Sequence, residues 1–138
     1  MTPTEGLNLA LDVENGIVTP APARYIGLFG NNYTPILTDT GATFPTAAGE
    51  LTTQYDEATR PLYVPAAASG GRADNSASLP TFTFNTTVNV FGCFLITGSS
   101  AKADLTGILR SAVLFASPRT YVAGETLSPP YYLIAQNL

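Results

Sequence analysis

The chain has 138 residues, of which 45% are hydrophobic and only 12% are charged, and it carries a net charge of −4. This length fits one domain, residues 1–138, and so low a charge leaves a surface of Thr, Ser, Asn and apolar atoms that favours association. The six basic residues lie singly between Arg24 and Arg119, which excludes the basic stripe needed for direct nucleic-acid binding. No apolar run approaches the roughly 18 residues of a membrane span, and no secretory signal is recognisable, so we expect a soluble product of the cytoplasm.

A short helix is predicted near the start of the chain. Thr4 can cap it, Glu5 suits its first turn, and Asn15-Gly16 can end it. Leu7, Ala10 and Leu11 share one face of this helix, which is therefore predicted to be its apolar face. Beyond it, 11 prolines and 12 glycines interrupt the chain too often for long helices, so the remainder is predicted to form strands and turns.

The strand predictions follow from periodicity. Arg24–Phe29 is almost continuously apolar, as in a strand covered on both faces, and residues 79–85 alternate with Phe82 and Phe84 on one face. Residues 87–96 are predicted to form a central strand and residues 107–115 a second long strand that can pair with it as a hairpin. We place Phe94 and Leu109 in the core, and we expect the lone Cys93 to be a buried, inert thiol.

The last predicted strand spans residues 127–134. Pro129-Pro130 moves it to a sheet edge, because a proline cannot donate a backbone hydrogen bond. The expected fold class is mainly β: a two-sheet antiparallel sandwich, jelly-roll-like, with one short N-terminal helix.

The middle of the chain, residues 38–78, is predicted to be one long loop excursion. Loops of this length inside a domain are usually functional or disordered, so we place a contact surface here, with Arg72 and Asp74 as candidate polar anchors. Tyrosine is enriched at protein interfaces, and the edge strand is a second place where subunits can meet. The further interface candidates are Tyr63, Pro129, Pro130 and Tyr131.

No catalytic centre is expected. The chain has no histidine, which excludes the commonest general base and metal ligand, so we expect neither an enzyme nor a bound cofactor. Asp39-Thr40-Gly41 matches the catalytic loop of aspartic proteases, but a single copy requires a symmetric dimer, and the tripeptide is also an ordinary turn in which the glycine takes a positive φ. Asp56 and Glu57 are expected to form a solvated turn with a local ion pair to Arg60.

The order of the motifs resembles that of the small virion structural proteins of tailed bacteriophages. The residues that carry this resemblance are 25–29, 49–51, Tyr55, 79–84, 90–95, 117–119 and 122–127. The resemblance implies a β-sandwich subunit of the virion, made in the host cytoplasm. A capsid decoration (cement) protein that binds and stabilises the shell is the first expectation, and a neck, tail or fibre component is the alternative.

Such a protein is expected to bind the major capsid protein or other virion proteins. We also expect a homo-oligomer, because a surface with few charges would leave apolar patches exposed on a monomer. A trimer is favoured because three-subunit junctions of a capsid are natural docking points.

Overall fold

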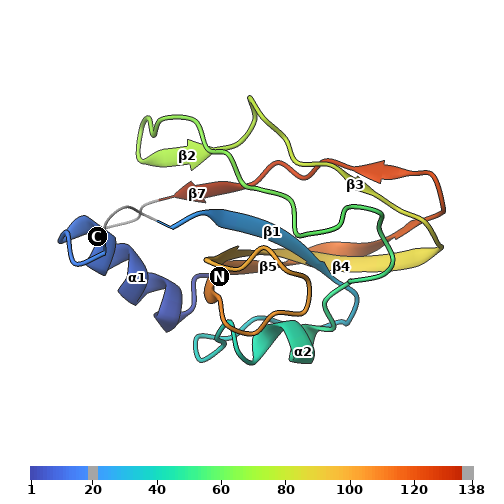
Figure 1. Ribbon diagram of the computed structural model, residues 1–138, viewed down its shortest axis with the longest axis horizontal. Coiled ribbons are helices and arrows are strands. Elements are labelled where there is room, and N and C mark those ends of the chain that lie inside the picture. The colour runs from blue at the N-terminus through green and yellow to red at the C-terminus, as the bar shows by residue number, and fades with distance from the viewer. Residues whose placement is uncertain (19–21, 135–138) are drawn as a thin grey trace.

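The computed structural model describes residues 1–18 and 22–134, and it is mainly β, with antiparallel strands and a short helix near the N-terminus, as predicted (Figure 1). The elements in chain order are α1 (Thr4–Glu14), β1 (Arg24–Phe29), α2 (Phe44–Ala48), β2 (Arg72–Asp74), β3 (Phe82–Thr83), β4 (Val88–Thr97), β5 (Ile108–Tyr121), β6 (Thr126–Leu127) and β7 (Tyr132–Ile134). Neither helix in these ranges has the length and apolar character that crossing a membrane requires.

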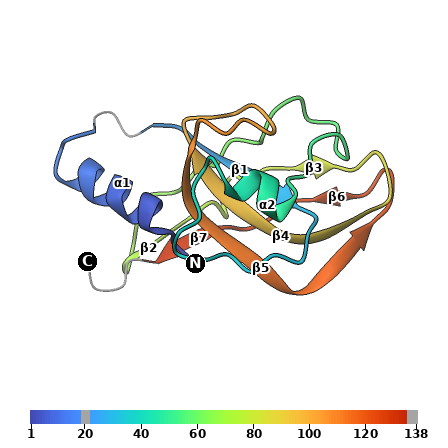
Figure 2. The same cartoon turned by 90° about the horizontal axis from the view of Figure 1, so that it is seen from below.

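The largest sheet has three antiparallel strands in the order β1-β4-β5. The central position of β4 and its hairpin with β5 confirm the prediction from periodicity, and β1 has the predicted bounds. β5 runs further than predicted, to Tyr121. Pro118 cannot donate a backbone hydrogen bond to β4, but it lies in a bulge opposite Phe91, and regular pairing with β4 resumes after it. Figure 2 shows the bend that this bulge gives the strand.

The remaining strands form two short antiparallel pairs, β2 with β7 and β3 with β6. The alternation predicted for residues 79–85 is confirmed in burial, since Phe82 and Phe84 are 0% and 1% exposed, although only two of these residues form strand β3. Both pairs lie on the same side of the three-stranded sheet in Figure 1.

The core has two parts, one on each face of the three-stranded sheet. The first contains Ile26, Leu28, Cys93 and Leu95 from that sheet, together with residues of the short pairs. In the second, Phe44 of α2 packs edge-on against Phe29 and Phe94, with ring centroids 5.5 and 5.4 Å apart. The core positions predicted for Phe94 and Leu109 are confirmed, since both side chains are fully buried.

Helix α1 forms where it was predicted, but the face predicted to be apolar does not pack on the sheet. Leu7 and Leu11 are 41% and 48% exposed, whereas Gly6 and Leu9 are buried. The reason is close contact: a Cβ on Gly6 would lie 2.5 Å from the carbonyl oxygen of Arg110, so only glycine lets α1 approach the backbone of β5. Thr4 also differs from its predicted role, because it lies inside the helix and Pro3 takes the cap position without a side-chain hydrogen bond.

The excursion over residues 38–78 is structured rather than a plain loop. It contains α2, which the sequence did not predict, and it covers the outer edge of β1 with backbone hydrogen bonds, including Leu51 N–H to Leu28 O (2.9 Å) and Tyr63 N–H to Arg24 O (2.8 Å). Covering an edge in this way removes a template on which another chain could pair.

Candidate functional site

An apolar groove of about 570 Å³ runs between β5 and the C-terminal strands, and we call it the β5 groove. No side chain that lines it is charged, and its walls include Val113, Phe115, Leu127, Pro130, Tyr132 and Leu133. Met1 also lines it: its terminal ammonium donates to Ala112 O (3.1 Å), and its carbonyl accepts from Ala112 N–H (3.0 Å). A groove of this size and lining is suited to apolar side chains.

Two of the titratable groups that line the groove, Cys93 and Tyr131, are neutral at neutral pH. Burial raises the pKa of the Cys93 thiol to about 12, so the nucleophilic thiolate is almost absent. Burial also raises the pKa of Tyr131, whose hydroxyl is hydrogen-bonded to Ser111 Oγ. These environments suit binding and do not activate a nucleophile.

Arg72 lies at the rim of the β5 groove. Its guanidinium carbon is 4.3 Å from the ring centre of Tyr132, a groove residue, and its Nε is 3.4 Å from Asp74 Oδ2. Hydrogen bonds from Ser76 lower the pKa of Asp74, so the carboxylate is charged at neutral pH. Arg72 follows a tight turn whose central residues are both glycines with positive φ, +59° and +75°, as a type I′ hairpin turn requires.

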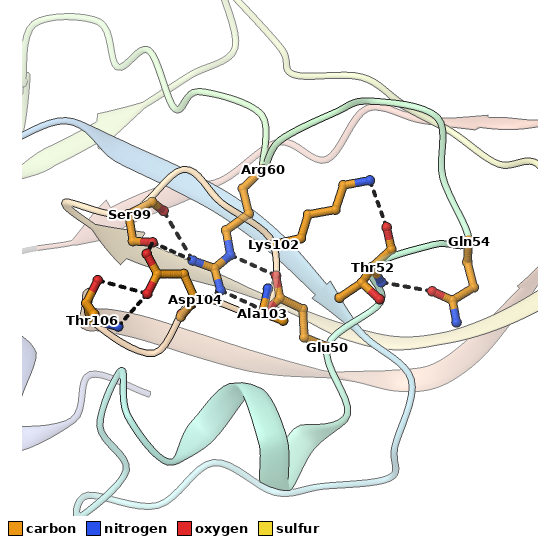
Figure 3. A network of polar contacts seen from close by, with 9 residues as sticks. All are labelled: Glu50, Thr52, Gln54, Arg60, Ser99, Lys102, Ala103, Asp104 and Thr106. Atoms are coloured by element: carbon orange, nitrogen blue, oxygen red, sulfur yellow. Dashed lines mark hydrogen bonds and ion pairs between the residues drawn. The ribbon is translucent and has the colours of Figure 1, made fainter.

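The sequence interpretation of Arg60 was wrong. Arg60 is fully buried, and its Nε and Nη2 each donate to one carboxylate oxygen of Glu50 at 2.7 Å (Figure 3). Its remaining donors reach Ser99 O, Ser99 Oγ and Asp104 O at 3.1 to 3.3 Å. We call these four residues the Arg60 cluster. It joins the segment after α2 to the loop between β4 and β5.

Asp104 completes the Arg60 cluster through its carboxylate. Ser99 Oγ donates to Asp104 Oδ2 (2.6 Å), and the N–H and hydroxyl of Thr106 donate to Oδ1. These hydrogen bonds lower the pKa of Asp104 to about 2. The carboxylate is therefore ionised and its oxygens are engaged, which is the environment of a structural group.

The acidic pair that was expected to face Arg60 has other partners. Glu57 accepts from the N–H and hydroxyl of Thr83, and Asp56 Oδ1 accepts from Asn85 Nδ2 (3.1 Å). Both carboxylates therefore anchor the excursion to β3 and the residues after it, and no ion pair joins either of them to Arg60 in the described ranges.

Asp39 has the role of a turn residue. Its carboxylate is buried and accepts from Tyr33 Oη and from Ile36 N–H, both at 2.7 Å. Gly41 does not take the positive φ that was expected of it. Glycine is needed there for another reason, because a Cβ would lie 1.8 Å from the carbonyl oxygen of Gly107.

The structure separates the predicted interface residues into two groups. Arg72, Asp74 and Pro130 are exposed or half-buried, and their interface role stays a prediction. Tyr63 and Tyr131 are only 3% and 7% exposed, and their rings contact each other edge-on with centroids 6.2 Å apart. These two tyrosines and Pro129 are buried within the chain, although Pro129 and Tyr131 also line the β5 groove, and their interface role likewise stays a prediction.

Sequence reasoning missed Glu50, Ser99 and Asp104. Their hydrogen bonds to Arg60 join residues 10, 39 and 44 positions apart, and no local spacing marks such a set. Within residues 1–18 and 22–134, no three or more Cys, Asp or Glu side chains are grouped so that they could hold a metal ion. No protein-family model matches this chain, and no curated protein matches its sequence.

Proposed function

We propose that this chain is a structural protein of a tailed phage particle, and specifically a capsid decoration protein that binds the major capsid protein and stabilises the shell. The observation that carries the proposal is the β5 groove, a mostly apolar surface without a charged side chain, on a chain with only 12% charged residues. Apolar surface left exposed on a small chain marks a site of protein contact. The resemblance of the motif order to that of small virion proteins is the reason for proposing this partner.

The groups that could react support a binding role over an enzymatic one. The only cysteine is held as a neutral thiol, and the carboxylate of Asp39 is engaged within its own turn. A dimeric aspartic protease needs two such carboxylates to share a proton across a symmetry axis, and Asp39 is already occupied by Tyr33 and Ile36. No specific observation favours the protease over the structural role.

We propose a homo-oligomer as the working form, with three copies as the number that suits a threefold junction of a shell. The exposed Leu7 and Leu11 of α1 and the open β5 groove support association, since both leave apolar area in water on a monomer. In this proposal the charged residues Arg72 and Asp74 and the exposed Pro130 contact neighbouring subunits. Many weak contacts of this kind stabilise a shell through multivalency.

A two-sheet sandwich, jelly-roll-like, is the proposed finer description of the fold. The support is the first core cluster, in which Phe82, Phe84 and Tyr131 from the region of the short pairs pack against Ile26 and Leu95 of the three-stranded sheet. In this description the pairs β2–β7 and β3–β6 are the second, interrupted sheet.

The copy number of the chain in the particle tests the decoration role. Quantitative mass spectrometry of purified particles should find the chain in an amount comparable with that of the major capsid protein. Image reconstruction should then place it on the outside of the shell. A dozen copies or fewer would refute the decoration role and assign the chain to the neck, tail or fibre instead.

A further inference from the structure

The outer face of α1 carries an apolar stripe that no element among residues 1–18 and 22–134 covers. Leu7, Leu11 and Glu14 are spaced i, i+4 and i+7, so they lie on one face of the helix. This face is turned away from β5, because Gly6 and Leu9 occupy the side that packs on the strand, and all three side chains are exposed. A helix that presents two leucines and one carboxylate in a row has the pattern of a helix that binds in a groove.

The β5 groove has the complementary chemistry. Its walls are mostly apolar and carry no charged side chain, and at its rim the guanidinium of Arg72 lies over the ring of Tyr132. The side chain of Arg72 is 50% exposed, and its two terminal nitrogens make no hydrogen bond within residues 1–18 and 22–134. The terminal nitrogens of this guanidinium can therefore donate to a carboxylate at the edge of an apolar site, the arrangement of many interface anchors.

We propose that α1 of one copy docks in the β5 groove of a second copy, with Leu7 and Leu11 in the groove and Glu14 paired with Arg72. This proposal rests on the homo-oligomer proposed above and specifies which two surfaces of the chain meet in it. Charge favours this occupant: α1 has acidic residues and no basic residue in its last turn, whereas no acidic side chain lines the groove and the Met1 ammonium does. At the rim, Arg72 is paired with Asp74 through Nε only, at 3.4 Å. The helix stripe and the groove are different surfaces of one chain, so the contact is head-to-tail. Repeated contacts of this kind form a closed ring if the rotation that relates one copy to the next divides a full turn evenly.

Two single variants and their mixture test the contact. Leu11→Lys blocks the helix stripe and leaves the groove intact, whereas Val113→Lys blocks the groove and leaves the helix intact. Both replaced side chains are more than 40% exposed, so the fold should be retained, and circular dichroism and Tm check this. Sedimentation velocity should show each variant alone as a monomer. An equimolar mixture should form a one-to-one dimer, because one intact helix stripe then meets one intact groove.

A charge exchange provides a second test that replaces no apolar side chain of the groove or of the helix stripe. Arg72→Glu should weaken association about tenfold, because an attractive exposed pair becomes a repulsive one of similar size. Adding Glu14→Arg to the same chain should restore association, whereas Asp12→Arg, on a different side of the helix, should restore less.

The outcomes separate this contact from the decoration role. Variants that keep the oligomeric mass of the wild type, or a mixture that stays monomeric, would overturn the proposed contact even if the particle carries many copies. An isolated wild-type chain that remains a monomer at high concentration would refute both the contact and the homo-oligomer. The decoration role depends on the copy number in the particle, which is measured independently.

Discussion

Replacing Glu50 with Leu should destabilise the fold by about 3 to 5 kcal/mol, because it takes from a fully buried guanidinium the carboxylate to which it is hydrogen-bonded. In the native protein Arg60 makes two hydrogen bonds of 2.7 Å to this carboxylate, and the side chain of Glu50 is itself only 2% exposed, so water cannot replace what is lost. For a chain of this size the loss should lower Tm by at least roughly 10 °C. Urea unfolding followed by circular dichroism measures the free energy directly.

A double-mutant cycle separates the ion pair from packing. Arg60→Met alone should also be costly, but the double variant should lose clearly less than the sum of the two single variants, because it buries no unpaired charge. Asp12→Leu is the control: its side chain is exposed, and the change should stay within about 0.5 kcal/mol. A loss below about 1 kcal/mol for Glu50→Leu, or additive losses in the cycle, would refute the account of a tightly coupled buried pair.

Three further predictions concern the core, a close approach and pH. Phe94→Ala should cost about 3 to 5 kcal/mol in urea unfolding, since the ring is fully buried against Phe44, and an unchanged midpoint would contradict its place in the core. Gly41→Ala should destabilise the protein more than Gly98→Ala does. The Cβ added at Gly41 would lie 1.8 Å from Gly107 O, whereas the Cβ added at Gly98 has open space, and the only cost there is a positive φ for alanine. The pKa of Asp104 is held at about 2, below its unfolded value, so its contribution to stability is complete above about pH 4 and is lost as pH falls toward 2. Asp104→Asn should make Tm fall less steeply as the pH is lowered from about 4 to 2. An unchanged dependence of Tm on pH would contradict the hydrogen bonds that we assign to the Asp104 carboxylate.

The strands of the main sheet could be predicted because their signal is local. Apolar runs at Arg24–Phe29 and over residues 87–96 identify strands covered on both faces, and the hairpin of β4 and β5 follows from their adjacency. The orientation of α1 could not be predicted in this way. Leu7 and Leu11 are the apolar residues that periodicity selects, but the contact of Gly6 with β5 decides which side of the helix packs.

The partners of the polar groups were harder to predict from the sequence than the strands. The proximity of Asp56 and Glu57 to Arg60 in sequence suggested an exposed ion pair, yet the partner of Arg60 is Glu50, brought to it by the turn after α2. The tyrosines could not be sorted by residue type either. Tyr131 and Tyr132 are neighbours, but Tyr131, which directly precedes β7, is buried, whereas Tyr132, the first residue of β7, is exposed.

The pairing of β1 with β4 has a consequence for how the protein folds. The two strands are joined only through residues 30–87, so their register forms by closing a very long loop, whereas β4 and β5 meet across the short connection at residues 98–107. Contacts between distant parts of a chain form late and slow the overall rate. We therefore expect the β4–β5 hairpin to be organised first, and β1 to add to it only when the segment that covers its outer edge is also in place. During that interval one side of β4 has no partner strand. A newly made chain is then most exposed to pairing with another chain.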